Sequence, residues 1–149
     1  MNKYLQSAKQ VIHIEQQALQ TLLDNLGSSF AQACETLLNC NGKVVVTGIG
    51  KSGHVGRKIA ATLASTGTPA FFVHPAEASH GDLGMISKQD VVLALSNSGE
   101  SQELLTILPV IKRIGAKLIS LTANDDSSLA HYSDVHILVK VEREACPLG

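Results

Sequence analysis

The stretch VVVTGIGKSGHVGRKIAATLASTG, residues 44–67, decides how the rest of the chain is interpreted. Four β-favouring residues precede the pattern Gly48-x-Gly50-x-x-Gly53, and a run that suits a helix follows it. A strand that passes into a helix through glycines is typical of phosphate-binding turns in α/β proteins. The same residues contain a Gly-Lys-Ser triplet, so a dinucleotide motif and a nucleotide P-loop are the two competing interpretations.

Neither nucleotide motif is complete. A P-loop requires a glycine five residues before the glycine of Gly-Lys-Ser, and this chain has Val45 there. A dinucleotide fold requires an acid about 20 residues on, at the end of the next strand. That strand ends in His74, and the first acid, Glu77, lies 29 residues past the first glycine. We therefore interpret the stretch as an anion-binding turn that carries a functional Lys51 and Ser52 and is sized for one phosphate or a sugar.

The composition favours a single α/β domain. The 149 residues are 44% hydrophobic and 17% charged, with five Phe or Tyr residues and no Trp, so Val, Ile, Leu and Ala must build the core. The net charge of −1 and the lack of like-charge blocks give no support to a nucleic-acid or membrane-surface partner. Without a signal peptide or a long apolar run, the expected location is cytoplasmic. Cys34, Cys40 and Cys146 have no metal-site spacing and are expected to be free thiols.

Residues 1–41 are expected to form a helical segment that precedes the main domain. The apolar residues of 3–26 recur at three- and four-residue spacing, which predicts one long helix with a wide apolar stripe. Gly27 is the predicted stop, and Ser28 or Ser29 is the predicted cap of a second helix that ends near Cys40. The width of the stripe favours contact with a second subunit.

After residue 42 the pattern alternates between strands and helices, which predicts βαβ units and a mostly parallel, doubly wound sheet. The expected inner face of the first helix after the opening strand consists of Val55, Ile59, Thr62 and Leu63. That helix is expected at 52–65 and a later one carries Leu104, Leu108 and Ile111 on one side. The predicted strands are 43–48, 69–74, 90–95, 117–122 and 135–140, with a loop at 75–86 that has room for a turn of helix and a short helix at 127–131.

Two strand-to-helix loops resemble each other: VVVTGIGKSG and VVLALSNSGES both pass from an apolar strand through small polar residues into a helix. In the strand order 2-1-3-4-5 these loops flank the topological switch point, where open α/β sheets bind ligands. We therefore expect a crevice between residues 48–53 and 96–101. The hydroxyl and amide groups of Ser96, Asn97, Ser98 and Ser101, together with free helix N–H groups, suit phosphate oxygens. Ordinary helix capping would use one of these serines, not all of them.

Three segments together resemble a known family: GIGKSGHVGRKIAATLASTGTPAFFVHPAEASHGDLGM, SNSGES and the terminal EREACPLG. They are similar to the sugar-isomerase (SIS) domain of arabinose-5-phosphate isomerases, nearly from end to end. The resemblance implies a flavodoxin-like, five-stranded parallel sheet over residues 42–149. It implies interconversion of D-ribulose 5-phosphate and D-arabinose 5-phosphate, which supplies 3-deoxy-D-manno-octulosonate for lipopolysaccharide. It also implies a homotetramer.

Aldose–ketose isomerisation moves a proton between C1 and C2, so it requires a base, an electrophile for the carbonyl oxygen and a clamp for the phosphate, and no redox cofactor. Lys51 is the candidate for the carbonyl oxygen or the phosphate. Glu100 and Glu103 both begin a helix, where acids also favour the helix dipole. The resemblance points to Glu103 and to Glu144 as the catalytic carboxylates.

The resemblance also implies further substrate contacts at Gly67, Thr68 and His80. It suggests His74 as a metal ligand, with zinc acting as an inhibitor and not as a required cofactor. By itself His74 is more often a hydrogen-bonded structural histidine, because one histidine makes no metal site.

Members of the family usually continue with a helical segment that carries a SHPGG-like histidine and then a pair of CBS domains. This sequence ends at Gly149, so we expect it to correspond to the SIS part and to bind substrate with weak turnover or none. Two other classes remain open: a sugar-phosphate sensor that binds without turnover, and an inert fragment that associates through its N-terminal helices. Lys51, Glu103 and Glu144 together favour the enzyme, because a sensor needs the serines but not the acids.

Overall fold

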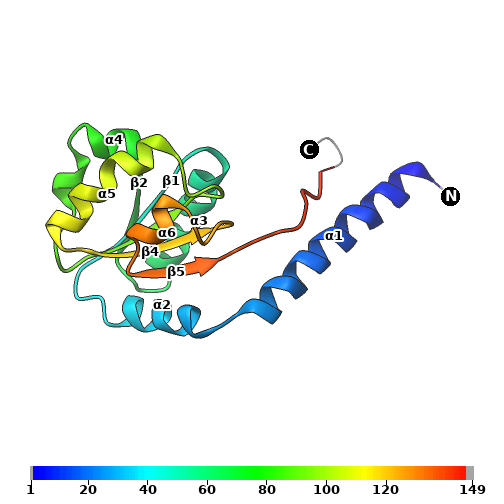
Figure 1. Ribbon diagram of the computed structural model, residues 1–149, viewed down its shortest axis with the longest axis horizontal. Helices are drawn as coiled ribbons and strands as arrows, with labels where there is room; N and C mark the ends of the chain where they lie inside the picture. The colour runs from blue at the N-terminus through cyan, green and yellow to red at the C-terminus, as the bar shows by residue number, and fades with distance from the viewer. Residues whose placement is uncertain (1, 147–149) are drawn as a thin grey trace.

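The computed structural model describes residues 2–146. Five parallel strands form one sheet in the order β2-β1-β3-β4-β5, which confirms the predicted order (Figure 1). Val45 of β1 lies opposite Phe71 of β2 on one side and Val92 of β3 on the other. The strands are β1 (Val44–Gly48), β2 (Ala70–Val73), β3 (Val91–Leu95), β4 (Lys117–Thr122) and β5 (Val135–Leu138).

Helices cover both faces of the sheet, because β1 and β3 are buried over their whole length and need apolar cover on each side. The short α4 (Pro75–Ser79), α5 (Gln102–Ile114) and α6 (Ser128–Tyr132) pack on one face. The other face carries α2 (Ser28–Leu38) and α3 (Gly50–Ser65). The segment at 75–86, expected to be a loop with room for a turn of helix, contains α4 and a 3-10 helix, Asp82–Met85. As predicted, the residues of α5 that face the sheet include Leu104, Leu108 and Ile111.

The inner face of α3 agrees with the prediction at Ile59 and Leu63, which pack against the core, and differs from it at Val55 and Thr62. Its buried residues are Gly53, Gly56 and Ala60, whereas Val55 is 53% exposed and Thr62 is also exposed. A Cβ atom on Gly53 would lie 2.8 Å from the carbonyl oxygen of Gly48, and one on Gly56 would meet the Phe72 ring at 3.1 Å. The small residues let α3 approach the sheet more closely than a stripe of large apolar residues would allow. The prediction assigned the large apolar residues to the inner face of α3 and did not foresee that small residues bring the helix close to the sheet.

The first helix, α1 (Lys3–Asn25), extends away from the sheet, and the chain that leaves β5 runs out on the same side (Figure 1). Ile14 is its one buried residue, and Glu142 and Arg143 line a cavity together with Ile14 and Thr21. The predicted cap of α2 was wrong: Gly27 is the N-cap residue, with no side-chain hydrogen bond, and Ser28 is already inside the helix. Within residues 2–146, no helix is both long and apolar enough to cross a membrane.

Candidate sugar-phosphate site

A cavity of about 320 Å³ opens at the carboxyl edge of the sheet, over the ends of β3 and β4 and against α3, the helix that follows β1. The first residues of α3 and the end of β3 line it, and the end of β4 closes it. This is the topological switch point, since α3 and α5 leave β1 and β3 toward opposite faces. Val55 is exposed on α3 because it faces this cavity. The polar residues of the lining are Lys51, Ser52, Ser96, Asn97 and Thr122, and most of the remaining wall is apolar.

Residues 96–101, which we call the serine loop, are held by their own hydroxyl groups. The Ser96 hydroxyl accepts the N–H of Gly99 at 3.1 Å and lies 3.1 Å from the Ser101 hydroxyl. The Ser98 hydroxyl accepts the N–H of Glu100 at 3.2 Å. Three serines that each take part in a hydrogen bond give the loop a defined shape and leave lone pairs and hydroxyl protons for an incoming oxyanion.

The two helices that begin at the cavity have no side-chain cap. Ile49 precedes α3 and Ser101 precedes α5, and neither side chain accepts a hydrogen bond from the first turn. By contrast, His74 caps α4 and Ser127 caps α6 through their side chains. The first N–H groups of a helix need an acceptor, so both helices can offer theirs to an anion at the switch point.

Lys51 and Glu103 both lie at this edge of the sheet. Lys51 is exposed in the first turn of α3 and lines the cavity. Among the described residues, the ion pairs are those of Asp134 and Asp126, so the Lys51 ammonium is not neutralised by a carboxylate. Glu103 is exposed in the first turn of α5, one residue past the start of that helix. Lys51 lines the cavity and Glu103 does not, so both lie at this edge of the sheet but only Lys51 reaches the cavity wall within one chain. An ammonium group and a carboxylate are the residue types that serve as electrophile and base in a proton transfer.

Glu100 has a different role from Glu103. One carboxylate oxygen of Glu100 accepts the N–H of Ser128, at the start of α6, at 2.6 Å. This backbone hydrogen bond is the main reason that the pKa of Glu100 lies below its usual value, and the Ser128 side chain and the nearby His131 lower it further. Glu100 therefore joins the serine loop to α6, and Glu103 remains the candidate for chemistry.

Ser98, Ser101 and Glu103, in and just after the serine loop, do not line the cavity. Four further predicted site residues lie elsewhere in the chain. Gly67 and Thr68 follow the far end of α3, and a 16-residue helix separates them from Lys51 by about 24 Å. His80 is exposed after α4. Glu144 lines a small cavity against α1 with Ser7 and Ile14, outside the α/β layer. Their predicted roles stay predictions, and one chain alone does not bring them to Lys51.

His74 makes a local hydrogen bond. Its Nδ1 atom accepts the N–H of Ala76 at 3.2 Å and so caps α4, which is the structural role that the sequence allowed for. Within the described part of the chain, no three His, Cys, Asp or Glu side chains are grouped as metal ligands. The suggested zinc contact at His74 stays a prediction.

The sequence interpretation missed Thr122 and His136. Thr122 lines the cavity, and its hydroxyl oxygen lies 2.9 Å from Nε2 of His136 on β5. Burial of His136 lowers the pKa of its imidazole, while the charge of Asp125 raises it to a smaller extent. The position of Thr122 at the carboxyl end of a predicted central strand was the available signal, since strand ends line ligand crevices in this architecture.

Comparisons with known proteins agree with this geometry. The family model of the SIS domain matches residues 37–148. The arabinose 5-phosphate isomerase KdsD of Pseudomonas aeruginosa is 60% identical over 146 residues, which cover 98% of this chain and 45% of the relative. The Yersinia pestis enzyme of the same name is 57% identical over 98% of this chain and 44% of its own length. The chain thus spans less than half the length of these relatives.

A solved structure of Escherichia coli CFT073 c3406 in complex with arabinose 5-phosphate superimposes with a TM-score of 0.93 and 48% sequence identity, covering 100% of this chain and 80% of that one. The family match includes β1 to β5 and both loops of the cavity, so it covers the parts of the fold that build the site. The chain belongs to the SIS domain family.

Proposed function

We propose that this chain is the sugar-phosphate-binding part of an isomerase that interconverts D-arabinose 5-phosphate and D-ribulose 5-phosphate. The observation that carries the proposal is the cavity at the switch point, where Lys51 and Ser52 of one loop face Ser96 and Asn97 of the other. The names of the relatives and the arabinose 5-phosphate complex of a similar structure support the same substrate class.

The phosphate is best accommodated by the serine loop and the first turn of α5. The hydroxyl groups of Ser96, Ser98 and Ser101 and the uncapped N–H groups of α5 offer several donors to one oxyanion. The apolar wall formed by Val55 and other aliphatic side chains limits water around the carbon chain of the sugar. Such a site favours a short phosphorylated sugar over a nucleotide, which would need a platform for its base.

The proton transfer needs two groups at C1 and C2. We assign the base to Glu103, which removes a proton from one carbon and returns it to the next through a cis-enediolate. Lys51 stabilises the negative charge that develops on the oxygen, because its ammonium group has no carboxylate partner among the described residues. The substrate is rearranged without a net change in electrons, so the proposed reaction requires no redox cofactor.

The remaining predicted residues favour a site that is shared between copies of the chain. His80, Gly67, Thr68 and Glu144 do not line the cavity of their own chain. The exposed apolar residues of α1 offer a surface on which a second copy can pack; they include Tyr4, Leu5, Ile12, Leu19 and Leu23. We therefore propose a homo-oligomer, as the homotetramer of the family resemblance implies, in which neighbouring chains bring these residues to the site of Lys51.

The proposal is tested by a coupled assay for ribulose 5-phosphate production from D-arabinose 5-phosphate. It uses the 149-residue chain and a form extended past Gly149 in parallel, together with calorimetric binding of the same sugar. The expected result is binding by both chains and fast turnover by the extended one. Binding without turnover by either chain would favour a sugar-phosphate sensor, and no binding by either would refute the assignment.

A further inference from the structure

The serine loop is held by the residue after β4 and by the first two residues of α6. Three of its acceptors receive N–H groups from them: Asn97 O from Ala123 at 2.9 Å, Gly99 O from Leu129 at 3.1 Å, and the Glu100 carboxylate from Ser128 at 2.6 Å. The first two contacts use the backbone and are independent of the side chains. The Glu100 carboxylate is the side-chain member of this set, and its bond is also the shortest.

The loop and its support are in tight contact. Gly99 has a φ of +70°, and a Cβ atom there would overlap the side chain of Ser127 and lie 3.3 Å from the Thr122 methyl carbon. The support is itself fixed, since the Ser127 hydroxyl donates to the Asn124 carbonyl at 2.7 Å. The Thr122 hydroxyl donates to the same carbonyl at 2.6 Å. Movement of the serine loop therefore requires either the loss of these contacts or the displacement of α6.

We infer that Glu100 is a positioning residue, whose carboxylate fixes the serine loop on the start of α6 in the conformation that receives the substrate's phosphate. The inference rests on the proposed function of that loop. Glu100 acts on the loop at two points, because its own N–H donates to the Ser98 hydroxyl at 3.2 Å while its side chain is held by Ser128. Losing the carboxylate frees the residue that orients Ser98.

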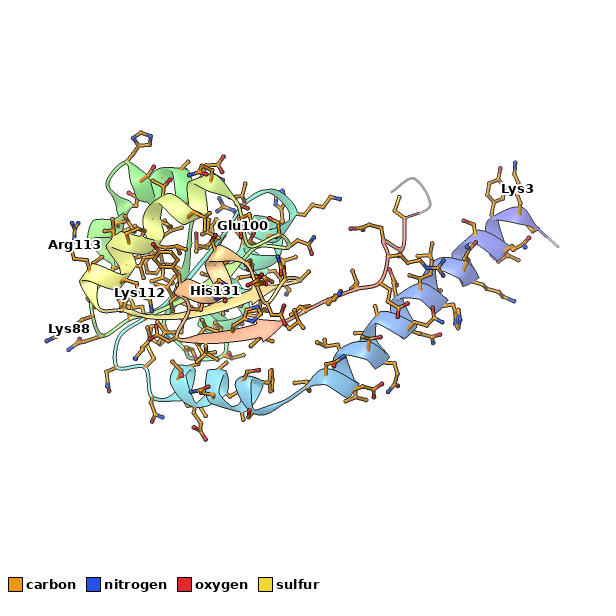
Figure 2. All side chains as sticks on the ribbon, viewed as in Figure 1. Lys3, Lys88, Glu100, Lys112, Arg113 and His131 are labelled. Carbon is orange, nitrogen blue, oxygen red and sulfur yellow. The ribbon has the colours of Figure 1, made fainter. Side chains whose placement is uncertain are left out.

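The chemistry around Glu100 argues against a role as base. The Ser128 N–H and the nearby His131 stabilise the carboxylate form, which lowers the pKa of Glu100 and makes it a poor proton acceptor. Figure 2 shows Glu100 and His131 well apart from Lys88 and Arg113, which lie at the other end of the α/β layer. A carboxylate in direct contact with a phosphate dianion would also be repelled, whereas one turned toward α6 keeps its charge away from the ligand.

The test uses inorganic phosphate and D-arabinose 5-phosphate as calorimetric probes on the 149-residue chain. Glu100→Ala should weaken binding of both ligands about tenfold, the usual effect of losing one hydrogen bond to a charged group. Glu100→Gln keeps an oxygen acceptor and should restore most of the affinity. In the amide NMR spectrum, the Ser128 N–H should shift upfield and exchange faster in Glu100→Ala than in Glu100→Gln.

Ser128→Pro removes the same hydrogen bond from the other side. Ser128 is the first residue of α6, where proline is well accommodated. Ser127 before it has φ −78° and ψ 154°, an extended conformation that is favoured for the residue preceding a proline. Ser128→Pro should lose phosphate affinity as Glu100→Ala does. The midpoint of its thermal unfolding should equal that of the unsubstituted chain. Adding Glu100→Ala to it should have no further effect. Glu35→Gln, which removes an exposed carboxylate from α2, is the control for a change in net charge.

Two results would overturn the inference. Unchanged phosphate affinity in both Glu100→Ala and Ser128→Pro would mean that the contact does not position the loop. An unaltered Ser128 amide in Glu100→Ala would mean that the contact does not form in solution. If the unsubstituted chain binds neither ligand, the proposed function fails first. The amide measurement still reports on the contact in that case, so the two failures are distinguishable.

Discussion

The Thr122 hydroxyl oxygen lies 2.9 Å from Nε2 of His136, and this contact joins the wall of the cavity at the carboxyl edge of the sheet to the edge strand β5. Thr122 donates its own proton to the Asn124 carbonyl at 2.6 Å, so Nε2 of His136 must carry the proton that the hydroxyl oxygen accepts. In the neutral imidazole of His136 the proton is therefore on Nε2, the nitrogen that faces Thr122.

His136 is expected to make stability dependent on pH. Burial lowers the pKa of its imidazole below the ordinary value of 6.5, and the Asp125 charge only partly opposes this. The unfolded chain therefore binds a proton more readily, so the stabilisation is complete above pH 6.5 and is lost as the pH falls through the folded pKa. His136→Gln keeps an N–H donor and cannot titrate, so its stability relative to the unsubstituted chain should improve as the pH falls below 6.5.

Urea unfolding at about pH 7.5 and at about pH 5.5 measures this effect, because the change in free energy between the two conditions reports the difference in bound protons. Gln32→Ala, on the exposed side of α2, changes no titratable group and should shift stability equally at both pH values. If His136→Gln changed the free energy of unfolding by the same amount at both pH values, the prediction would be contradicted.

Gly53→Ala should destabilise the chain by about 1–3 kcal/mol, as overpacking usually does. An alanine inside a helix is ordinarily favoured over glycine by about 1 kcal/mol. Here the Cβ atom would lie 2.8 Å from the Gly48 carbonyl oxygen, so α3 would have to move off the sheet and take Lys51 with it. Gly84→Ala is the matched control because a Cβ there meets no atom within 4 Å. Thermal or urea unfolding would decide, and a stabilised Gly53→Ala chain would show that α3 is not in close contact.

Glu103→Gln, in the extended form, should lower kcat by about 10²–10⁴-fold if Glu103 is the base. KM should hardly change, since the amide keeps the shape and most hydrogen-bonding capacity of the side chain. Steady-state kinetics of the coupled assay measure both terms, with Glu35→Gln as the control. A silent Glu103→Gln together with a silent Glu144→Gln would leave sugar-phosphate sensing as the better account.

Lys51→Ala should impair kcat and KM together if the ammonium contacts the substrate in its ground state. It should impair mainly kcat if the ammonium acts only on the developing enediolate. Lys58→Ala removes another exposed cation from α3 and is the control for the general electrostatic attraction of a phosphate. Equal losses in the two variants would assign Lys51 to attraction alone.

The exposed stripe of α1 predicts association in solution. Leu5, Ile12 and Leu19 recur every seven residues and are each more than half exposed, so they form one apolar line along the helix. Light scattering at micromolar concentration should return at least twice the 15.7 kDa mass of one chain. Ile12→Glu with Leu19→Glu should reduce the mass to one chain, while Gln6→Glu, on another face of the helix, should leave it unchanged. A single-chain mass before any substitution would refute the role of α1.

Much of the fold follows from patterns that act locally. The run Val44–Val46 favours a strand buried on both faces, and the two similar loops indicate that β1 and β3 lie side by side, as the structure confirms. Lys51 and the serine loop were predicted to meet because the carboxyl ends of neighbouring parallel strands share an edge. Sequence periodicity and strand-end position were sufficient for these features.

Other features depend on distances that no local pattern encodes. Val55 was expected on the inner face of α3, but Gly53, Gly56 and Ala60 form the buried face and Val55 lines the cavity. The placement of Glu144 beside α1 depends on the path of the chain after β5, which has no periodicity to read. Glu100 and Glu103 look alike in sequence, and only the position of Ser128 separates them.

The isolation of α1 has a consequence for how the chain folds. A helix of 23 residues spans about 34 Å, and without tertiary contacts an isolated helix of such length is only marginally stable in water. The α/β layer has its own core, whereas α1 lies against the segment after β5 near Ile14 and leaves most of its apolar side chains exposed for contact with other chains. Folding of α1 and association are then one equilibrium governed by mass action. Dilution should melt α1 first, so the helical content of each molecule depends on how many other molecules are in solution.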